Sequence, residues 1–304
     1  MRFFIFFLSL FSSLAFANQE LVIEPDLGRA PILSFISDAE KSIDLVMYGF
    51  TDSVIADHLI SAKKQNKNIR VLLEPYPYKT AGENDAISKK LQSANIKILT
   101  PHPDVKLTHQ KTLMSDQNRA MIMTFNFTHS TFSKERNFAL VIDDPAMVSE
   151  IIRVFNADVR HKHISVSQPN LVWSPNNSRE KILDFINHAD SEIKIYAQDI
   201  TDYQVIGALA KAARAGKKVA ILTNEPKPDN HSKKYAYLRK AGVIIHFSKS
   251  YRIHAKVIMI DKKRAMLGSI NLTRASINDN RELAVITQQE SIITQLIAMF
   301  DHDF

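Results

Sequence analysis

Apolar and polar positions change along the chain in a pattern that predicts helices and strands in turn. Apolar residues at helical spacing predict helices, and short apolar runs between polar residues predict buried strands. The first half is predicted to contain a helix near 31–40, a strand at 42–48, a second helix opened by Asp52 and a strand at 69–73. Because a strand, a helix and a strand in this order form a crossover unit, we expect a largely parallel, buried sheet.

Further elements complete this half of the chain. A third helix is predicted near 84–94, followed by a strand that ends at Leu99. Asp144-Pro145 then begins a helix that runs to about Val159. The stretch 160–177 is expected to connect this half to the next.

The same series of elements recurs about 150 residues later. Ile32-Leu33-Ser34-Phe35-Ile36 reappears as Ile182-Leu183-Asp184-Phe185-Ile186, and the flanking apolar positions follow in the same register. Two copies of this length are too long for a solenoid repeat, so each copy should be a domain. We therefore predict two duplicated α/β domains, at residues 18–165 and 166–304, each with a mixed, mostly parallel sheet flanked by helices.

The first residues have the pattern of a secretory signal peptide. Arg2 is followed by an apolar run from Phe3 to Leu14, which ends in the small-x-small site Ala15-Phe16-Ala17. Spanning a bilayer takes about 20 apolar residues, and this run is shorter. We expect residues 1–17 to be cleaved and the protein to be exported, either to the periplasm or to the medium of a bacterium. An uncleaved anchor and a buried N-terminal helix are the alternatives.

The composition excludes several kinds of site. Among 304 residues there is no cysteine, which excludes a disulfide framework, a thiolate metal site and a cysteine nucleophile. There are only 7 glycines and no glycine-rich phosphate-binding motif. The net charge of +7 falls to about +6 when Arg2 is removed with the signal peptide. This charge suits an anionic partner without selecting one.

Each half carries the same polar residues after its predicted strands. In the first half these are His109, Lys111, Asp116, Thr124 and Asn126, and in the second half His254, Lys256, Asp261, Ser269 and Asn271. Residues two apart in a strand share a face, so the histidine and lysine of each copy should point the same way. The polar turn at each aspartate predicts a hairpin, whose returning strand brings the hydroxyl and amide to the same patch.

Two such patches facing each other suit phosphodiester chemistry. One imidazole can attack phosphorus to form a covalent intermediate, while the other protonates the leaving oxygen. The lysines and amides can stabilise negative charge on the phosphoryl oxygens. Because these fixed groups neutralise the phosphate, we expect neither a catalytic metal nor another cofactor.

The doubled motif H-x-K-x4-D-x6-G-S-x-N resembles that of the phospholipase D superfamily. The second copy matches it at every defined position, and Asn280-Arg281-Glu282 is similar to the family's downstream Asn-x-Glu, whose carboxylate orients a histidine. The first copy departs from the motif, with Met123-Thr124 in place of Gly-Ser and Asn137 where the second copy has Glu282. The resemblance implies two α/β domains related by a pseudo-two-fold axis, with one active site between them in a monomer.

The resemblance also implies roles for the motif residues. The N-terminal histidine, His109, is expected to be the nucleophile and His254 the general acid, but the Asn137 substitution leaves this order open. Asp116 and Asp261 are better suited to supporting the hairpins than to catalysis.

The family includes phospholipases, cardiolipin synthases and nucleases. Export and the lack of a later membrane-spanning segment favour a phospholipase D that acts on a phospholipid or an anionic membrane surface. An exported nuclease acting on nucleic acid is the alternative. A non-catalytic binding module is a third hypothesis. Headgroup preference, and the choice between hydrolysis and transfer to an alcohol, stay open.

Overall fold

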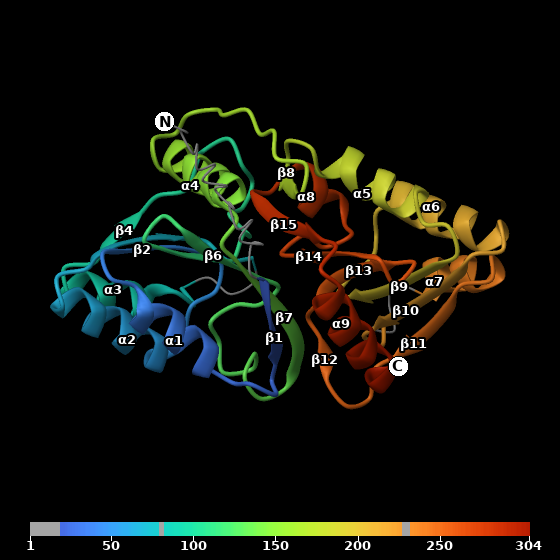
Figure 1. Cartoon of the computed structure of the whole chain (residues 1–304), viewed down its shortest axis with the longest axis horizontal. Helices are drawn as coiled ribbons and strands as arrows, with labels where there is room; N and C mark the ends of the chain where they lie inside the picture. The colour runs from blue at the N-terminus through green and yellow to red at the C-terminus, as the bar shows by residue number, and fades with distance from the viewer. Residues whose placement is uncertain (1–18, 79–81, 227–231) are drawn as a thin grey trace, which may run out of the picture.

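A computed structural model describes residues 19–78, 82–226 and 232–304, which form two domains around two mixed sheets (Figure 1). The predicted signal peptide at residues 1–17 lies outside the described residues. Within the described ranges, no helix has the length and apolar character needed to cross a membrane.

The first domain forms one sheet with the strand order β1-β7-β6-β5-β2-β3-β4. Its elements are β1 (Gln19–Glu24), α1 (Ala30–Asp38), β2 (Ser42–Met47), α2 (Ser53–Lys64), β3 (Asn68–Leu73), α3 (Asp85–Ser93), β4 (Lys97–Leu99), β5 (Thr112–Ser115), β6 (Arg119–Met123), β7 (Glu135–Ile142) and α4 (Pro145–Val159).

The second domain repeats this arrangement strand by strand, in the order β8-β15-β14-β13-β9-β10-β11. Its elements are β8 (Leu171–Ser174), α5 (Ser178–Asn187), β9 (Glu192–Ala197), α6 (Tyr203–Arg214), β10 (Lys218–Thr223), α7 (Ser232–Lys240), β11 (Ile244–Phe247), β12 (Arg252–Ile253), β13 (Lys256–Ile260), β14 (Arg264–Gly268), α8 (Arg274–Asn278), β15 (Glu282–Thr287) and α9 (Glu290–Asp303). The short strand β12 belongs to the second half of the chain but pairs with β7 of the first sheet.

The predicted fold class, two duplicated α/β domains with mixed sheets flanked by helices, is confirmed. The mostly parallel pairing does not hold, because among the described strands parallel pairs join only β2–β4, β9–β11 and the short β12 to β7. The remaining pairs in both sheets are antiparallel. The short turns between β5 and β6 and between β13 and β14 require this pairing, because such turns can join only antiparallel strands.

The change from the first sheet to the second occurs between α4 and β8. The stretch 160–177 that we expected to be a connection therefore contains β8, a strand too short to stand out from its surroundings. We keep the domain boundary between residues 165 and 166 as a proposal.

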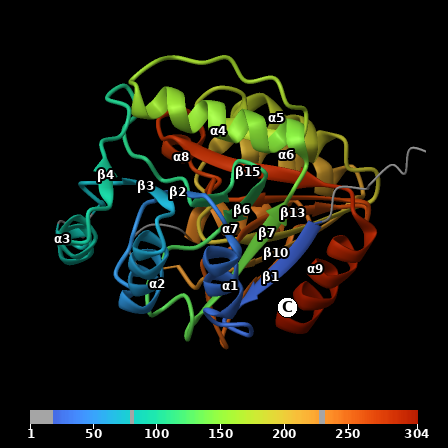
Figure 2. The ribbon, with the colours of Figure 1, turned by 60° about the vertical axis from the view of Figure 1, so that its left-hand side comes forward.

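The helices divide the apolar interior into three cores. One core lies between α1–α3 and the first sheet, and a second between α5–α7 and the second sheet. The third contains buried side chains from both sheets and from α4 and α9, among them Phe138, Trp173, Tyr196 and Phe300. Figure 1 shows α1–α3 and α5–α7 on the outer sides of the two domains, and Figure 2 shows the first domain turned forward. The third core therefore joins the domains into one body.

Both copies begin their second helix in the same way. The carboxylate of Asp52 caps α2 by accepting the N–H of Ile55, and Asp202 caps α6 by accepting the N–H of Val205. Each aspartate also pairs with an arginine at the start of the preceding helix, Arg29 or Arg179. The predicted helix start at Asp52 is therefore confirmed, Asp202 begins the corresponding helix of the second copy, and the duplication extends to their ion pairs.

Candidate active site

The two motif histidines lie directly before hairpin strands, and the backbone of the opposite domain holds each of them. His109 precedes β5, and its N–H donates to the carbonyl oxygen of Arg281 at 3.0 Å. His254 precedes β13, and its N–H donates to the carbonyl oxygen of Arg136 at 3.2 Å. Because both bonds cross between the domains, the two motifs meet at the domain interface.

The histidine side chains are also oriented across this interface. The Nδ1 atom of His109 lies 2.8 Å from a carboxylate oxygen of Glu282, and Nδ1 of His254 lies 3.0 Å from the amide oxygen of Asn137. From the sequence, the Asn137 substitution left the role of His109 open. In the structure, Asn137 contacts His254, and His109 has a carboxylate partner.

The residues that orient the histidines belong to two tripeptides with the same composition in reverse order. The first domain has Glu135-Arg136-Asn137, and the second has Asn280-Arg281-Glu282. The amide of Asn280 donates to Glu282 at 3.2 Å, and the amide of Asn137 donates to Glu135 at 3.3 Å. Each histidine therefore bonds to one member of an asparagine–glutamate pair, the carboxylate of Glu282 for His109 and the amide of Asn137 for His254.

Sequence reasoning compared Asn137 with Glu282 alone and missed Glu135. A carboxylate oxygen of Glu135 lies 3.8 Å from Nδ1 of His254, and the other oxygen accepts from Arg252 at 3.1 Å. The signal that could have identified Glu135 is the reversed order of the two tripeptides.

The central arginine of each tripeptide is buried and bonds to the end of a helix in the other domain. Arg136 donates to Asp303 of α9 at 2.7 Å, and Arg281 donates to Asp158 of α4 at 2.9 Å. Only 2% of Arg136 and 7% of Arg281 is exposed. Charge-assisted bonds of this kind keep their geometry well, so the flanking orienting residues are fixed in position.

Two buried lysines lie beside the histidines. Lys111 donates to the carbonyl oxygen of His109 at 2.5 Å, and Lys256 donates to that of Thr124 in the other domain at 3.1 Å. Burial lowers the pKa of Lys111 to about 7, although the charge of Glu282 opposes this shift. Burial and the neighbouring charge of Lys111 lower the pKa of Lys256 well below its usual value. Since each charge is poorly solvated here, the site favours binding of an anion.

Burial also keeps both imidazoles neutral. It lowers the pKa of His109 to about 4, with the charge of Glu282 acting in the opposite direction. The pKa of His254 is lowered by burial and by the charges of Lys256 and Lys111. Because the Nδ1–H of each neutral ring is donated to its orienting residue, the lone pair lies on Nε2. Within the described ranges neither Nε2 has a hydrogen-bond partner, so both can reach a substrate.

Glu282 remains ionised although it is fully buried. Burial raises its pKa, but the positive charges around it and the hydrogen bond from His109 outweigh burial and lower the pKa below its usual value. A buried carboxylate that stays charged can stabilise a positive charge that develops on the His109 ring.

The two motif hydroxyls tie neighbouring strands together. Thr124 donates to the amide oxygen of Asn137 and accepts the N–H of Phe138, both at 2.9 Å. Ser269 accepts the N–H of Leu283 at 3.1 Å. Thr124 thereby fixes the amide that orients His254, while Ser269 holds the strand that carries Glu282.

The motif asparagines lie at the ends of the returning strands. Asn126 follows β6, and its amide oxygen accepts the N–H of Gly49 at 3.3 Å. Asn271 follows β14, and its buried amide oxygen has no hydrogen-bond partner among the described residues. In both cases no partner for Nδ2 is found in the described part of the chain, which leaves these N–H groups as donors for a ligand.

The difference between Gly268 and Met123 has a steric reason. A Cβ atom at Gly268 would lie 2.3 Å from the carbonyl oxygen of Leu283 and 2.4 Å from Cα of Ala284. The second copy therefore requires glycine where β14 approaches β15. In the first copy, β6 and β7 accommodate the side chain of Met123, which is fully buried.

The motif aspartates lie at the hairpin turns. Asp116 accepts the N–H groups of Glu40, Lys41 and Ser42 at 2.7–2.9 Å. Asp261 repeats this arrangement with residues 190–192. Burial would raise the pKa of Asp116, but the three N–H bonds outweigh it and lower the pKa. These bonds attach each hairpin to the turn before the neighbouring strand. Both carboxylates are thus occupied by backbone N–H groups in a structural arrangement.

Tyr48 is a site neighbour that sequence reasoning missed. Its ring centre lies 4.6 Å from that of His109 in an edge-on contact, and the Lys111 ammonium lies 5.0 Å from it. Its hydroxyl accepts the N–H of Tyr78 at 2.6 Å. Nothing in the sequence marks an aromatic residue at the end of an apolar strand as a neighbour of the motif histidine.

Comparison with known proteins gives a family match over both domains. The family model described as "Cardiolipin synthase, PLD-like domain" matches residues 32–159 and 182–304. A phospholipase D of Rickettsia conorii is 30% identical over 44% of this chain and 70% of its own length. Cardiolipin synthase B of Salmonella typhi is 23% identical over 92% of this chain and 73% of its own length.

Other matches share the fold or part of a longer chain. The crystal structure of phosphatidylserine synthase from Haemophilus influenzae superposes with a TM-score of 0.72 at 14% identity, over 92% of this chain and 84% of that chain. A polyphosphate kinase of Vibrio parahaemolyticus is 26% identical over 56% of this chain. The matched region covers only 26% of the length of that kinase.

The burial of His109 leads to a prediction about its titration. We expect imidazole NMR signals to show His109 neutral from pH 6.5 down to about 4. The unfolded chain binds this proton near the ordinary histidine pKa of about 6.5. Because the folded chain binds it only at lower pH, this group's contribution to stability is lost as pH falls from 6.5 towards 4.

Two variants complete this NMR experiment. The His109→Gln variant assigns the signal by its loss. In Glu282→Gln the His109 signal should titrate at a still lower pH, since the carboxylate that raises its pKa is gone. Titration of His109 near pH 6.5 in the unmodified protein would contradict the expectation.

Proposed function

Since the chain belongs to the phospholipase D superfamily, we propose that it is a metal-independent phosphodiesterase that removes phospholipid headgroups through a phosphohistidine intermediate. The observation that carries this proposal is the pair of neutral imidazoles, each held through Nδ1 by the opposite domain and each beside a buried lysine. One chain supplies both histidines, so the site needs no second copy and we propose a monomer.

In the proposed first step, Nε2 of His109 attacks phosphorus. The new P–N bond forms while the bond from phosphorus to the headgroup oxygen breaks, and His254 gives that oxygen a proton. His254 enters this step protonated, which the negative charge of a bound phosphodiester favours.

Water attacks phosphorus in the second step. His254 takes a proton from the attacking water as the P–N bond breaks, which releases phosphatidate and restores both rings. In both steps the ammonium groups of Lys111 and Lys256 and the amides of Asn126 and Asn271 stabilise the charge on the phosphoryl oxygens.

The different partners of the two histidines support this order. A phosphorylated His109 carries positive charge, and the carboxylate of Glu282 at 2.8 Å can stabilise it. His254 is held by the neutral amide of Asn137, while the nearest oxygen of Glu135 is 3.8 Å away. An imidazolium with a neutral partner is the stronger acid, which suits the role of proton donor.

A phospholipid substrate is supported by an exposed aromatic loop. Tyr76 is 78% exposed and Tyr78 is 68% exposed in the segment after β3. Glu74 connects this segment to the motif, since its carboxylate accepts the N–H of Tyr76 at 3.0 Å and that of Thr108 at 2.7 Å. Tyrosine is well suited to a membrane surface, because its ring is apolar and its hydroxyl is polar.

The names of two relatives give further support for a lipid substrate. Cardiolipin synthase B and phosphatidylserine synthase align with both domains of this chain, and both names refer to phospholipids.

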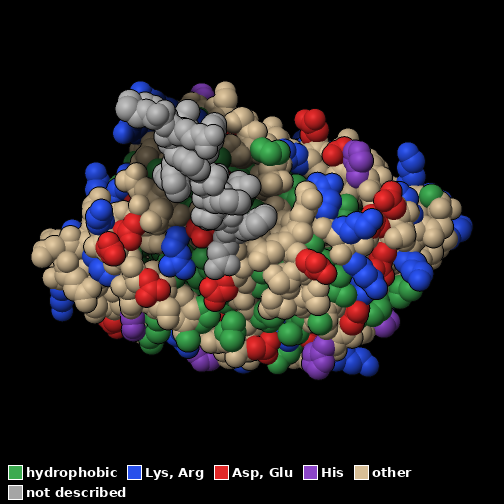
Figure 3. Space-filling view, in the orientation of Figure 1, with side chains coloured by type: hydrophobic (Ala, Val, Ile, Leu, Met, Phe, Trp, Pro, Cys, Tyr) green, Lys and Arg blue, Asp and Glu red, His purple; other side chains and the backbone are tan. Residues whose placement is uncertain are grey.

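The basic residues give little support to nucleic acid as the substrate. Lys67 donates to the carbonyl oxygen of Ser37 at 2.9 Å, and Lys217 donates to that of Ala189, so both lysines bond to residues at a helix end. Figure 3 shows Lys and Arg side chains interspersed with Asp and Glu on the face in view. We therefore do not propose an exported nuclease, and the test below includes DNA to detect one.

We also propose export, on the basis of the N-terminal pattern of residues 1–17. Protein recovered from the producing cells or their medium should begin at Asn18, as measured by N-terminal sequencing or intact mass. An N-terminus at Met1 in the fully matured protein would contradict this proposal.

The substrate proposal predicts release of headgroup in the presence of a chelator. Purified protein should release choline from phosphatidylcholine vesicles in EDTA, because the reaction uses only side chains of the chain. Matched reactions should contain plasmid DNA and single-stranded DNA in the same buffer.

Three results would contradict parts of this proposal. Degraded DNA with no choline would favour the nuclease, activity lost in EDTA would exclude the metal-independent mechanism, and no activity on any substrate would favour the binding module.

The order of the histidines predicts different effects on substrates with different leaving groups. An alcohol headgroup needs a proton to leave, whereas p-nitrophenolate leaves without one. His254→Ala should therefore lose at least about 100-fold in rate on phosphatidylcholine. On bis(p-nitrophenyl) phosphate its first turnover, measured as a burst of p-nitrophenolate, should slow by less than about 10-fold, because only the second step then needs His254. His109→Ala should lose at least about 100-fold on both substrates, because no covalent intermediate can form.

Thermal unfolding of both variants serves as the control for folding. If His109→Ala retains the p-nitrophenyl activity and His254→Ala loses it, the roles of the two histidines are reversed.

A further inference from the structure

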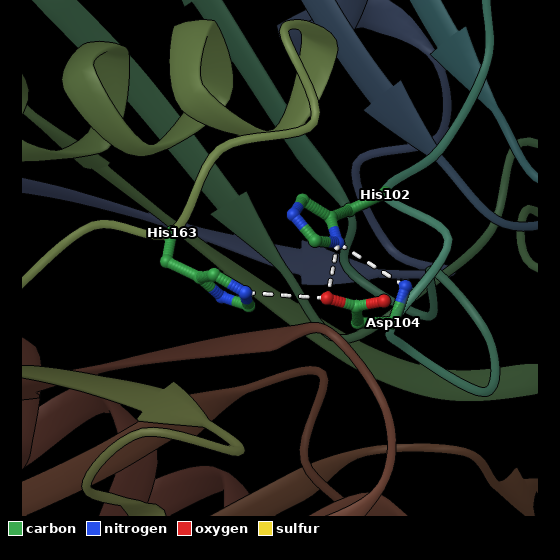
Figure 4. A group of neighbouring side chains, drawn as sticks. All are labelled: His102, Asp104 and His163. Atoms are coloured by element: carbon green, nitrogen blue, oxygen red, sulfur yellow. Dashed lines mark hydrogen bonds and ion pairs between the residues drawn. The ribbon is translucent and has the colours of Figure 1, made fainter.

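Two histidines and one aspartate gather outside the set of residues assigned to catalysis (Figure 4). His102 and Asp104 lie in the loop between β4 and β5, and His163 lies in the segment that follows α4. One ligand atom from each of the three residues lies within 4.8 Å of the other two. Residues far apart in the sequence thus place two imidazole nitrogens around one carboxylate.

The distances are close to those of a metal centre. A carboxylate oxygen of Asp104 lies 3.2 Å from Nε2 of His163 and 4.0 Å from Nδ1 of His102. Tetrahedral Zn²⁺ with bonds of about 2.0–2.1 Å holds its ligand atoms about 3.3 Å apart. Asp104 and His163 have 61% and 86% of their side chains exposed, so small rotations can close the remaining difference.

His102 is the buried member of the group. Only 5% of it is exposed, and Nδ1 accepts the N–H of Asp104 at 3.2 Å. This bond places the ring proton on Nε2 and occupies the Nδ1 lone pair, so a metal ion at Nδ1 would replace the hydrogen bond from the Asp104 N–H. Nε2 itself is buried and has no hydrogen-bond partner among the described residues. At 3.2 Å the hydrogen bond to Nδ1 is at the long end of the usual range, so a metal–nitrogen bond at Nδ1 can displace it.

The donor set selects the kind of ion. Two imidazoles and one carboxylate suit Zn²⁺ and other late first-row divalent cations, whereas Mg²⁺ and Ca²⁺ prefer oxygen ligands. A third imidazole, that of His161, packs edge-on against His102 with ring centres 6.1 Å apart. The surroundings of the cluster are therefore rich in nitrogen donors.

We propose that His102, Asp104 and His163 bind a late first-row divalent cation such as Zn²⁺, with water as the fourth ligand. The bound ion ties the segment between the domains to the loop that leads to His109. Its role is structural, so the proposal is independent of the reaction assigned to the active site.

The test uses the full, untagged chain after removal of metals with a chelator. Zn²⁺ should raise Tm by at least about 3 °C at saturating concentration, while Mg²⁺ and Ca²⁺ should not. Co²⁺ should give the visible absorption bands of a tetrahedral centre. Asp104→Asn and His163→Ala should each weaken Zn²⁺ binding at least tenfold in calorimetric titrations. Both changes are at exposed side chains, so the variants should fold.

The matched control is His188→Ala. His188 is an exposed histidine whose Nδ1 lies 2.9 Å from a carboxylate oxygen of Asp184, but no further metal-binding side chain completes a cluster there within the described residues. Its loss should leave Zn²⁺ affinity unchanged.

Equal Zn²⁺ affinity in the unmodified protein, Asp104→Asn and His163→Ala would overturn the proposal, as would no Zn²⁺ binding at all. Neither result bears on phosphodiesterase activity in EDTA, so failure of this site and failure of the proposed function can be told apart.

Discussion

The exchange of contacts between the two domains is the constraint on which the site depends. The side chain of His109 is oriented by Glu282, and that of His254 by Asn137, each from the opposite domain. The backbone bonds before β5 and β13 also cross the interface, and so do the buried arginine–aspartate pairs, with one bond of each kind donated from each domain. Neither domain alone could therefore hold an oriented histidine, and the apolar core shared by both sheets is a condition for the chemistry.

Duplication made the two halves alike, and one reversed tripeptide made them different. With glutamate directly at His109 and asparagine directly at His254, the two rings have unequal electrostatic surroundings although their positions correspond. A reaction through a covalent intermediate needs such inequality, because one ring must carry a phosphoryl group while the other moves protons. The exchange of Glu135 and Asn137 relative to the second copy supports this division of roles.

Burial of the cations sets the preference for an anionic ligand. The lowered pKa values of Lys111 and Lys256 mean that their ammonium groups are poorly compensated by the protein itself. A bound phosphodiester provides the missing negative charge, which returns these lysines and His254 to their protonated forms. Substrate binding and activation of the general acid are thereby coupled in the proposed mechanism, and both follow from excluding water from the same few side chains.

The sequence by itself determined the duplication, most helices and strands, and the identity of the motif residues. These features depend on spacings of a few residues or on a constant offset, which a single chain displays directly. The tertiary structure decided which residues meet: Glu282 with His109 across 173 positions, Glu135 beside His254, and His102 near His163. It also decided that antiparallel pairs outnumber parallel ones in each sheet. Such contacts arise where two folded domains pack together, and no local pattern encodes the face that each presents to the other.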